Sequence, residues 1–177
     1  GTFEFGKPAR NSCVFETPRH HFESTTPLPM RNLLLLVFLA LPATATDLIF
    51  DTFESDGFGE WLVEGDAFGK APTAVTPQGV NGKITGYSGQ YFVSSAHGGD
   101  KPIGSLTSPG FKISQPFLGF MIAGGSHKGK TAVQLLIGDK ITFEATGQNS
   151  LEMQKVVWPL KDYQGKQAKI RIIDAEP

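Results

Sequence analysis

Apolar and polar residues alternate along much of the chain in short runs, with glycine-rich turns between them. Segment 167–174, Gln-Ala-Lys-Ile-Arg-Ile-Ile-Asp, has this alternation over most of its length. Segment 140–146 shows it too, and the two residues Gly138 and Asp139 join it to the apolar run 131–137. Such alternation is typical of strands with one buried face, and a two-residue turn between them predicts a β-hairpin.

The same pattern predicts further short strands along the chain. They are expected at 47–54, 60–65, 90–94, 104–109, 111–113, 116–123 and 153–160. Run 116–123 is almost wholly apolar, which suits a strand buried on both faces. Turns roughly every 8–12 residues favour an all-β fold, a two-sheet antiparallel β-sandwich of jelly-roll type, with no helix longer than a turn or two.

The beginning of the chain has a different pattern. Met30 and Arg31 precede a short apolar run at 33–41, then Pro42 and the small residues of 43–45. This order predicts a signal peptide over 30–45, cleaved after Ala45. The run has about nine residues, whereas a membrane span needs roughly 20. We therefore expect a secreted or periplasmic protein that leaves the membrane once the signal is removed.

The signal pattern divides the chain into three parts. Residues 1–29 are expected to be disordered or mis-started upstream sequence, with a long natural leader as the alternative. Residues 46–177 are expected to form one β-sandwich domain, because that length suffices for a single core.

Composition changes this picture little. The 177 residues have a formal net charge of -1, which does not indicate nucleic acid as a partner. Glycine (21), proline (12) and phenylalanine (14) are frequent, as expected for a turn-rich β domain. The single cysteine, Cys13, excludes an intradomain disulfide and a thiolate metal site.

Two glycine-rich loops, each with one histidine, are the main candidates for a functional site. The first carries His97 and Asp100, and the second carries His127 and Lys130. Zinc could be bound by His97, Asp100 and His127 if the loops meet, but the spacing matches no compact zinc motif. No Gly-x-Ser-x-Gly elbow accompanies the serines near His97, so no catalytic residue is assigned.

Carboxylates and tryptophans offer two weaker signals. A structural calcium ion is conceivable at Asp51, Glu54 and Asp174, the alternative being solvated acids at strand ends. No other cofactor is expected. Trp61 could stack on a sugar ring, or it could be a core residue. Glycoside hydrolysis needs two acids facing one cleft, and nothing in the sequence singles out such a pair.

Five blocks in order resemble a known family. They are 53–69, 94–100, 104–111, 120–131 and 165–174, including Ser-Ser-Ala-His-Gly-Gly-Asp and Met-Ile-Ala-Gly-Gly-Ser-His-Lys-Gly-Lys-Thr. Together they resemble the N-terminal module that precedes the catalytic domain in bacterial levanase-like enzymes of glycoside hydrolase family 32. The resemblance implies a carbohydrate-binding-module-like β-sandwich attached to a catalytic propeller.

The resemblance also implies what this chain lacks. The propeller's motifs, Trp-Met-Asn-Asp-Pro-Asn-Gly and Arg-Asp-Pro, do not occur in it. Family members usually continue after the Ile-Ile-Asp strand through another segment into a closing strand. This implies that the chain is a fragment, truncated at Pro177, whose parent is a glycoside hydrolase.

Two hypotheses follow from the sequence. In the first, the chain is a secreted non-catalytic module that binds a polysaccharide such as fructan, or packs on the catalytic domain of the same protein. The expected contacts are Trp61, His97, Asp100, His127 and Lys130. In the second, the chain is a purely structural or interaction β-sandwich whose histidine loops brace the fold and bind no sugar.

Overall fold

The computed structural model of the chain describes residues 2–4 and 47–177. Cys13 and the predicted signal peptide at 30–45 lie outside the described residues. Within the described part, the only helical segment is the short 3₁₀ turn η1 (Lys161–Tyr163), and no helix is long and apolar enough to cross a membrane.

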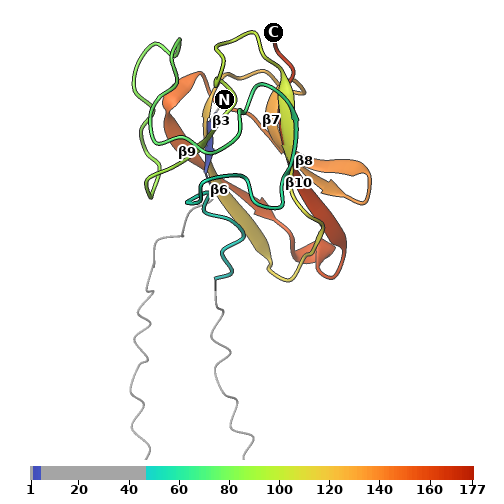
Figure 1. Ribbon diagram of the computed structural model, residues 1–177. Helices are drawn as coiled ribbons and strands as arrows, with labels where there is room; N and C mark the ends of the chain where they lie inside the picture. Colours follow the sequence, from blue (N-terminus) through green and yellow to red (C-terminus); the bar gives the residue numbers. More distant parts are fainter. Residues whose placement is uncertain (1, 5–46) are drawn as a thin grey trace, which may run out of the picture. The chain divides into compact units, whose positions relative to one another are not determined.

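Within these described residues, ten strands form two antiparallel sheets (Figure 1). The strands are β1 (Thr2–Glu4), β2 (Leu62–Gly65), β3 (Val93–Ser94), β4 (Gly104–Thr107), β5 (Phe111–Lys112), β6 (Phe117–Gly124), β7 (Thr131–Ile137), β8 (Lys140–Ala145), β9 (Ser150–Pro159) and β10 (Gln167–Asp174). One sheet has four strands in the order β3-β1-β6-β9. The other has six, in the order β2-β4-β10-β7-β8, with β5 also paired to β10. The expectation of an all-β antiparallel fold is confirmed.

Both sheets contribute side chains to one hydrophobic core. From the six-stranded sheet, Leu106, Val133 and Ile172 are fully buried in this core. Phe120 and Trp158 join them from the four-stranded sheet. Each of these residues alternates with a polar or partly exposed neighbour along its strand, so the alternation in the sequence marks the core-facing side.

A smaller cluster lies on the other face of the four-stranded sheet. Ile84 and Phe92 pack there against Ala123 and Met153. Segment 73–92 covers this face: one β-bridge joins Thr73 to Phe92 within it, and another joins Thr85 to Glu152 of β9. The cover explains why the second half of β6 is buried on both faces, as the apolar run 116–123 predicted. The first half is not covered, and Phe117 is exposed.

The strand expected at 47–54 is absent, so that prediction is wrong. Phe53 has a left-handed backbone (φ 56°), which no regular strand accommodates. Its N–H donates to Asp51 Oδ1 at 2.8 Å, and its ring is buried in the core. The apolar pattern in this segment therefore reflects aromatic side chains inserted into the core from an irregular segment.

Strand β1 also differs from the prediction, because segment 1–29 was expected to lie outside the fold. Thr2 pairs with Ser94 of β3 on one side and with Ala123 of β6 on the other. Pairing through the backbone depends little on side-chain pattern, so the apolar periodicity gave no signal for it. β1 precedes the predicted cleavage site, so cleavage after Ala45 would remove it from the sheet.

Candidate functional site

The two histidine loops cross between the sheets at the same end of the molecule. The first loop leads from β3 to β4, and the second leads from β6 to β7. In the six-stranded sheet, Asp174 pairs with Gly104 on one side and with Thr131 on the other, so the two loops enter this sheet on either side of β10. In the four-stranded sheet they leave on either side of β1. With about 4.8 Å between strands, the loops lie roughly 10 Å apart at both ends.

The chain ends lie between these loops. β1 begins there at Thr2, and β10 ends there at Asp174. Figure 1 shows the C-terminus in this region. The candidate site thus comprises two loops and the C-terminal residues 175–177, and we call it the loop end.

In the first loop, His97 is held mainly through the backbone. Its N–H donates to the carbonyl of Ala67 at 3.1 Å. Its imidazole lies on Gly69 so closely that a Cβ at that position would be 2.6 Å from Cγ of the ring. His97 is nevertheless exposed, as is Asp100. Asp100 forms no hydrogen bond or ion pair with any other described residue, so its carboxylate is available to a ligand.

In the second loop, charged side chains meet the C-terminal residues. Lys130 Nζ is 2.8 Å from Glu176 Oε2, and His127 Nδ1 is 3.8 Å from the same oxygen. The hydrogen bond from Lys130 lowers the pKa of Glu176 below its ordinary value of 4.5, and the charges of Lys130 and His127 act in the same direction. The backbone N–H of Ala175 donates to the carbonyl of Lys130 at 2.8 Å.

Glu176 was not among the residues expected from the sequence. A signal was present, because an acid soon after the last predicted strand must lie near that strand's end. The sequence did not show that the second histidine loop would reach the same place. That proximity depends on β7 pairing with β10, which the strand pattern does not specify.

The three acids considered for a calcium site form hydrogen bonds with protein groups instead. Asp51 accepts hydrogen bonds from Phe53 N and, at 2.7 Å, from Nε1 of Trp61. Glu54 accepts from the N–H groups of Gln90 and Tyr91.

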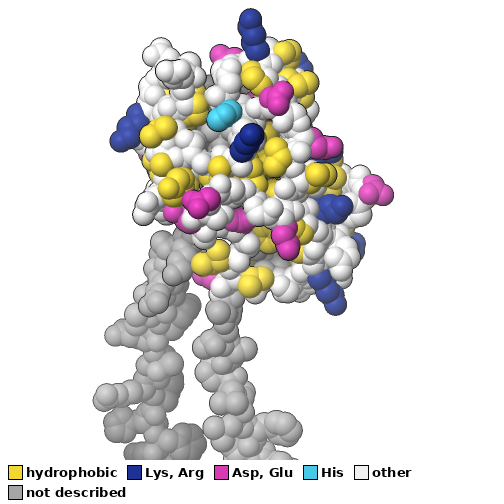
Figure 2. Space-filling view, in the orientation of Figure 1, with side chains coloured by type: hydrophobic (Ala, Val, Ile, Leu, Met, Phe, Trp, Pro, Cys, Tyr) yellow, Lys and Arg dark blue, Asp and Glu magenta, His cyan; other side chains and the backbone are white. Residues whose placement is uncertain are grey.

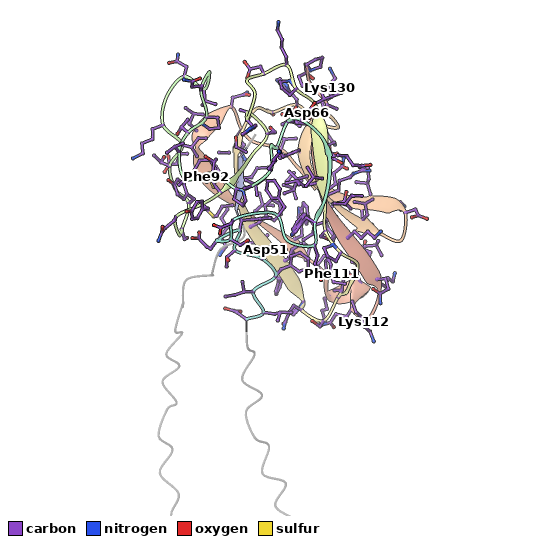
Figure 3. The ribbon with its side chains drawn as sticks, viewed as in Figure 1. Asp51, Asp66, Phe92, Phe111, Lys112 and Lys130 are labelled. Atoms are coloured by element: carbon purple, nitrogen blue, oxygen red, sulfur yellow. The ribbon has the colours of Figure 1, made fainter. Side chains whose placement is uncertain are left out.

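Asp174 lies far from the other two acids. It accepts from the Thr131 hydroxyl and from the N–H of Glu176, so it belongs to the loop end. Figure 3 shows Asp51 well away from Lys130, the neighbour of Thr131. Among residues 2–4 and 47–177, no group of three or more His, Cys, Asp or Glu side chains could hold a metal ion. Neither the calcium site nor the zinc site considered from the sequence is formed by these side chains.

Trp61 is a core residue, so the expectation of a sugar-stacking platform needs correction. Only 7% of its surface is exposed. Its ring packs against Phe53 with centroids 5.2 Å apart and edge-on to Phe50 at 6.2 Å. Because its indole N–H is bonded to Asp51, both the apolar ring and its polar group are satisfied inside the protein.

The loop end offers hydrogen-bonding groups of both kinds on exposed loops. Lys130 and the two imidazoles can donate, and Asp100 can accept. On the face shown in Figure 2, basic and acidic side chains are interspersed and a histidine lies close to a basic side chain. Such a face carries no extended patch of one sign of charge that would attract a strongly charged ligand.

Comparison with known proteins gives one informative match. The "Putative glycosyl hydrolase ecdE" of Aspergillus rugulosus is 31% identical over 130 residues. The match covers 72% of this chain and 18% of that protein, so the chain spans less than a fifth of the relative's length. No family model matches the chain, and no solved structure matches it. The match supports a relation to a glycoside hydrolase.

Proposed function

We propose that the chain is a non-catalytic carbohydrate-binding module of a secreted, levanase-like glycoside hydrolase of family 32. Its fold would be a β-sandwich of jelly-roll type, and its ligand a polysaccharide such as fructan. The observation that carries this proposal is the 130-residue match to a small part of a much longer protein named as a glycosyl hydrolase. A match of this extent suits a module that accompanies a catalytic domain.

The loop end is the proposed contact surface. His97, Asp100, His127 and Lys130 would bond sugar hydroxyls, since imidazole, ammonium and carboxylate groups supply both donors and acceptors. Their exposure supports this role. Trp61 is left out because its ring is buried.

The test is retention of the full-length chain on immobilised levan and inulin and on a printed glycan array. Circular dichroism and sedimentation would first establish that the protein is folded. We expect retention on at least one polysaccharide, and a loss of about tenfold in affinity for Lys130→Met, because a hydrogen bond to a charged group is removed. Lys140→Met, in the β7–β8 hairpin, is the matched control. A folded protein that binds no glycan would refute the proposal.

The alternative is a structural role, and two observations favour it. The ring of His97 lies on Gly69, and Lys130 is paired with Glu176, so both loops are also braces of the fold. In that case the loop variants would lower the melting temperature, and no polysaccharide would bind even the wild-type protein. Docking of a neighbouring domain on the loop end, with no sugar site, would belong to this alternative.

Secretion is the other part of the proposal. It depends on the signal pattern at 30–45, outside the described residues. N-terminal sequencing of the protein recovered from culture medium should give Thr46 as the first residue. A secreted chain that still begins at Gly1 would contradict the proposed cleavage.

A further inference from the structure

A row of polar side chains crosses the face of the six-stranded sheet that points away from the core. Thr107 of β4 lies opposite Arg171 of β10, which lies opposite Gln134 of β7, which lies opposite Glu144 of β8. Residues that pair directly across antiparallel strands point to the same face. Their chain neighbours Leu106, Ile172, Val133 and Leu135 are fully buried in the core. The row therefore lies on the opposite face and spans four strands, or about 14 Å.

Three of these side chains are bonded in series. Nε and Nη2 of Arg171 both donate to Oε1 of Gln134, at 3.0 and 2.6 Å. Nε2 of Gln134 donates to Oε2 of Glu144 at 2.7 Å. Gln134 is only 2% exposed and is hydrogen-bonded on both sides. It therefore fixes the guanidinium of Arg171 on one side and the carboxylate of Glu144 on the other.

Arg171 and Glu144 keep hydrogen-bonding capacity for a ligand. A guanidinium has five N–H donors in a fixed plane, of which the bonds to Gln134 use only some. Both residues are partly exposed, whereas the amide between them is not. A planar donor group and an acceptor, held at a fixed spacing, match the alternating donor and acceptor character of hydroxyl groups along a sugar chain.

The charges on this face indicate which class of sugar ligand it would bind. Arg171 and Glu144 carry opposite charges, with a neutral amide between them, so the row has no net charge. A second pair on this face, Ser105 and Glu64, is also hydrogen-bonded, at 3.0 Å. An anionic polysaccharide would gain from Arg171 but be repelled by the two glutamates, whereas a neutral oligosaccharide meets no such penalty.

The row is continuous with the loop end. Oε1 of Glu144 accepts a hydrogen bond from the backbone N–H of Gly129 at 3.1 Å. Gly129 lies in the second histidine loop, next to Lys130. An extended ligand could therefore contact hydrogen-bonding groups continuously from the loop end to the face of the sheet.

We propose that this face of the six-stranded sheet binds a neutral oligosaccharide, with Arg171 and Glu144 as contacts and Gln134 as the residue that positions both. The inference rests on the proposed carbohydrate-binding function and adds a second region to its site. It predicts that affinity depends on the sheet as well as on the loops.

The test uses the full-length chain, a glycan array and calorimetric titration with inulin-derived oligosaccharides. Arg171→Met keeps the apolar stem but removes the guanidinium, and Glu144→Gln removes the charge at nearly constant size. We expect each to weaken binding about tenfold or more, because bonds to charged groups are lost. Lys155→Met, on β9 of the other sheet, should bind as the wild type does. Thermal melting of every variant separates lost contacts from lost folding.

The outcomes distinguish this inference from the proposed function. If the wild type binds sugar and folded Arg171→Met and Glu144→Gln bind equally well, the sheet face is not a binding region, although the module still binds carbohydrate. If the folded wild type binds no glycan, the proposed function fails and this inference fails with it. Binding of acidic polysaccharides alone, lost at high salt, would also overturn the inference.

Discussion

The two histidine loops cross between the same two sheets, yet they are held in different ways. The first is seated by close approach of backbone to backbone. A Cβ added at Gly65 would be 2.3 Å from the Ile103 carbonyl oxygen, and one at Gly104 would be 2.5 Å from that of Glu64. The second loop also begins with a close approach, since a Cβ added at Gly147 would be 2.2 Å from the Gly124 carbonyl oxygen. Its tip, however, is held by polar contacts, the ion pair of Lys130 and Glu176 and the hydrogen bond from Gly129 N–H to Glu144, and Gly129 has open space around it.

The two kinds of contact differ in how strongly they respond to solution conditions. Backbone packing tolerates no added atom and does not respond to salt or pH. An exposed ion pair contributes little on its own, is screened by salt and depends on ionisation. We therefore expect the first loop to keep its conformation under most conditions, and the second to loosen when its charges are neutralised.

The largest effect is expected from Gly65→Ala. Gly65 has a left-handed backbone (φ 73°), and the new methyl group would also collide with the Ile103 carbonyl. Strain and collision together should lower the free energy of unfolding by roughly 2–4 kcal/mol. Urea denaturation followed by tryptophan fluorescence measures it, since both tryptophans are buried.

Gly129→Ala is the matched control from the second loop. Its φ of 76° is nearly the same, but nothing lies within 4 Å of the added Cβ. Only the left-handed conformation is penalised, at about 1–2 kcal/mol. Equal losses for the two variants would contradict the claim that the base of the first loop, at Ile103, is packed more closely than the tip of the second.

An intermediate effect is expected from Gly69→Ala. The added methyl group would meet the His97 ring, and a side chain can move where a backbone carbonyl cannot. We expect a loss of roughly 1–3 kcal/mol and a change in the NMR shifts of the imidazole. The double variant with His97→Ala should lose less than the two single variants added together, because the collision is removed. Strict additivity would show that the ring does not rest on Gly69.

The smallest effect is expected from Glu176→Gln, and it should depend on pH. Because the pKa of Glu176 is lowered in the folded state, its charge stabilises the fold above the ordinary pKa of 4.5. That contribution is lost as the pH falls through the lowered value. The wild type should therefore melt slightly higher than the variant at pH 7 and no higher at strongly acidic pH, with a smaller difference in 1 M NaCl.

Glu60→Gln serves as the control for this pH dependence. Glu60 is exposed and forms no ion pair with any other residue in the described part of the chain. Its removal should leave the melting temperature almost unchanged at both pH values. A difference for Glu176→Gln that persists at acidic pH would show that charge is not what holds the second loop.

Much of the strand pattern could be predicted from the sequence because it is local. β10 occupies 167–174 as its alternation predicted, and the β7–β8 hairpin forms around Gly138 and Asp139. The prediction failed where a contact distant in sequence sets the conformation. At 47–54 the aromatic residues fill the core from a non-strand backbone, and β1 exists only because β3 and β6 lie on either side of it.

The candidate site could be predicted only in part. Glycine-rich composition and exposed polar residues marked His97, Asp100, His127 and Lys130 as loop residues, and the structure places all four at exposed positions on loops. The sequence could not decide between the two expectations for Trp61, because a tryptophan in a strand-like segment suits both a surface platform and a core position. The hydrogen bond to Asp51, which decides for the core position, is a tertiary contact.

The sequence by itself determined most of the strands and turns, though not β1 or the irregular segment 47–54, because periodicity and glycine act within a few residues of the chain. Only the tertiary structure decided which of these segments meet. It brought both histidine loops to one end of the molecule, joined Glu176 to Lys130, and aligned Arg171, Gln134 and Glu144 in one row. The reason is physical: outside a tight hairpin such as β7–β8, strand register depends on core packing between segments far apart in the chain, and no local pattern specifies the partner.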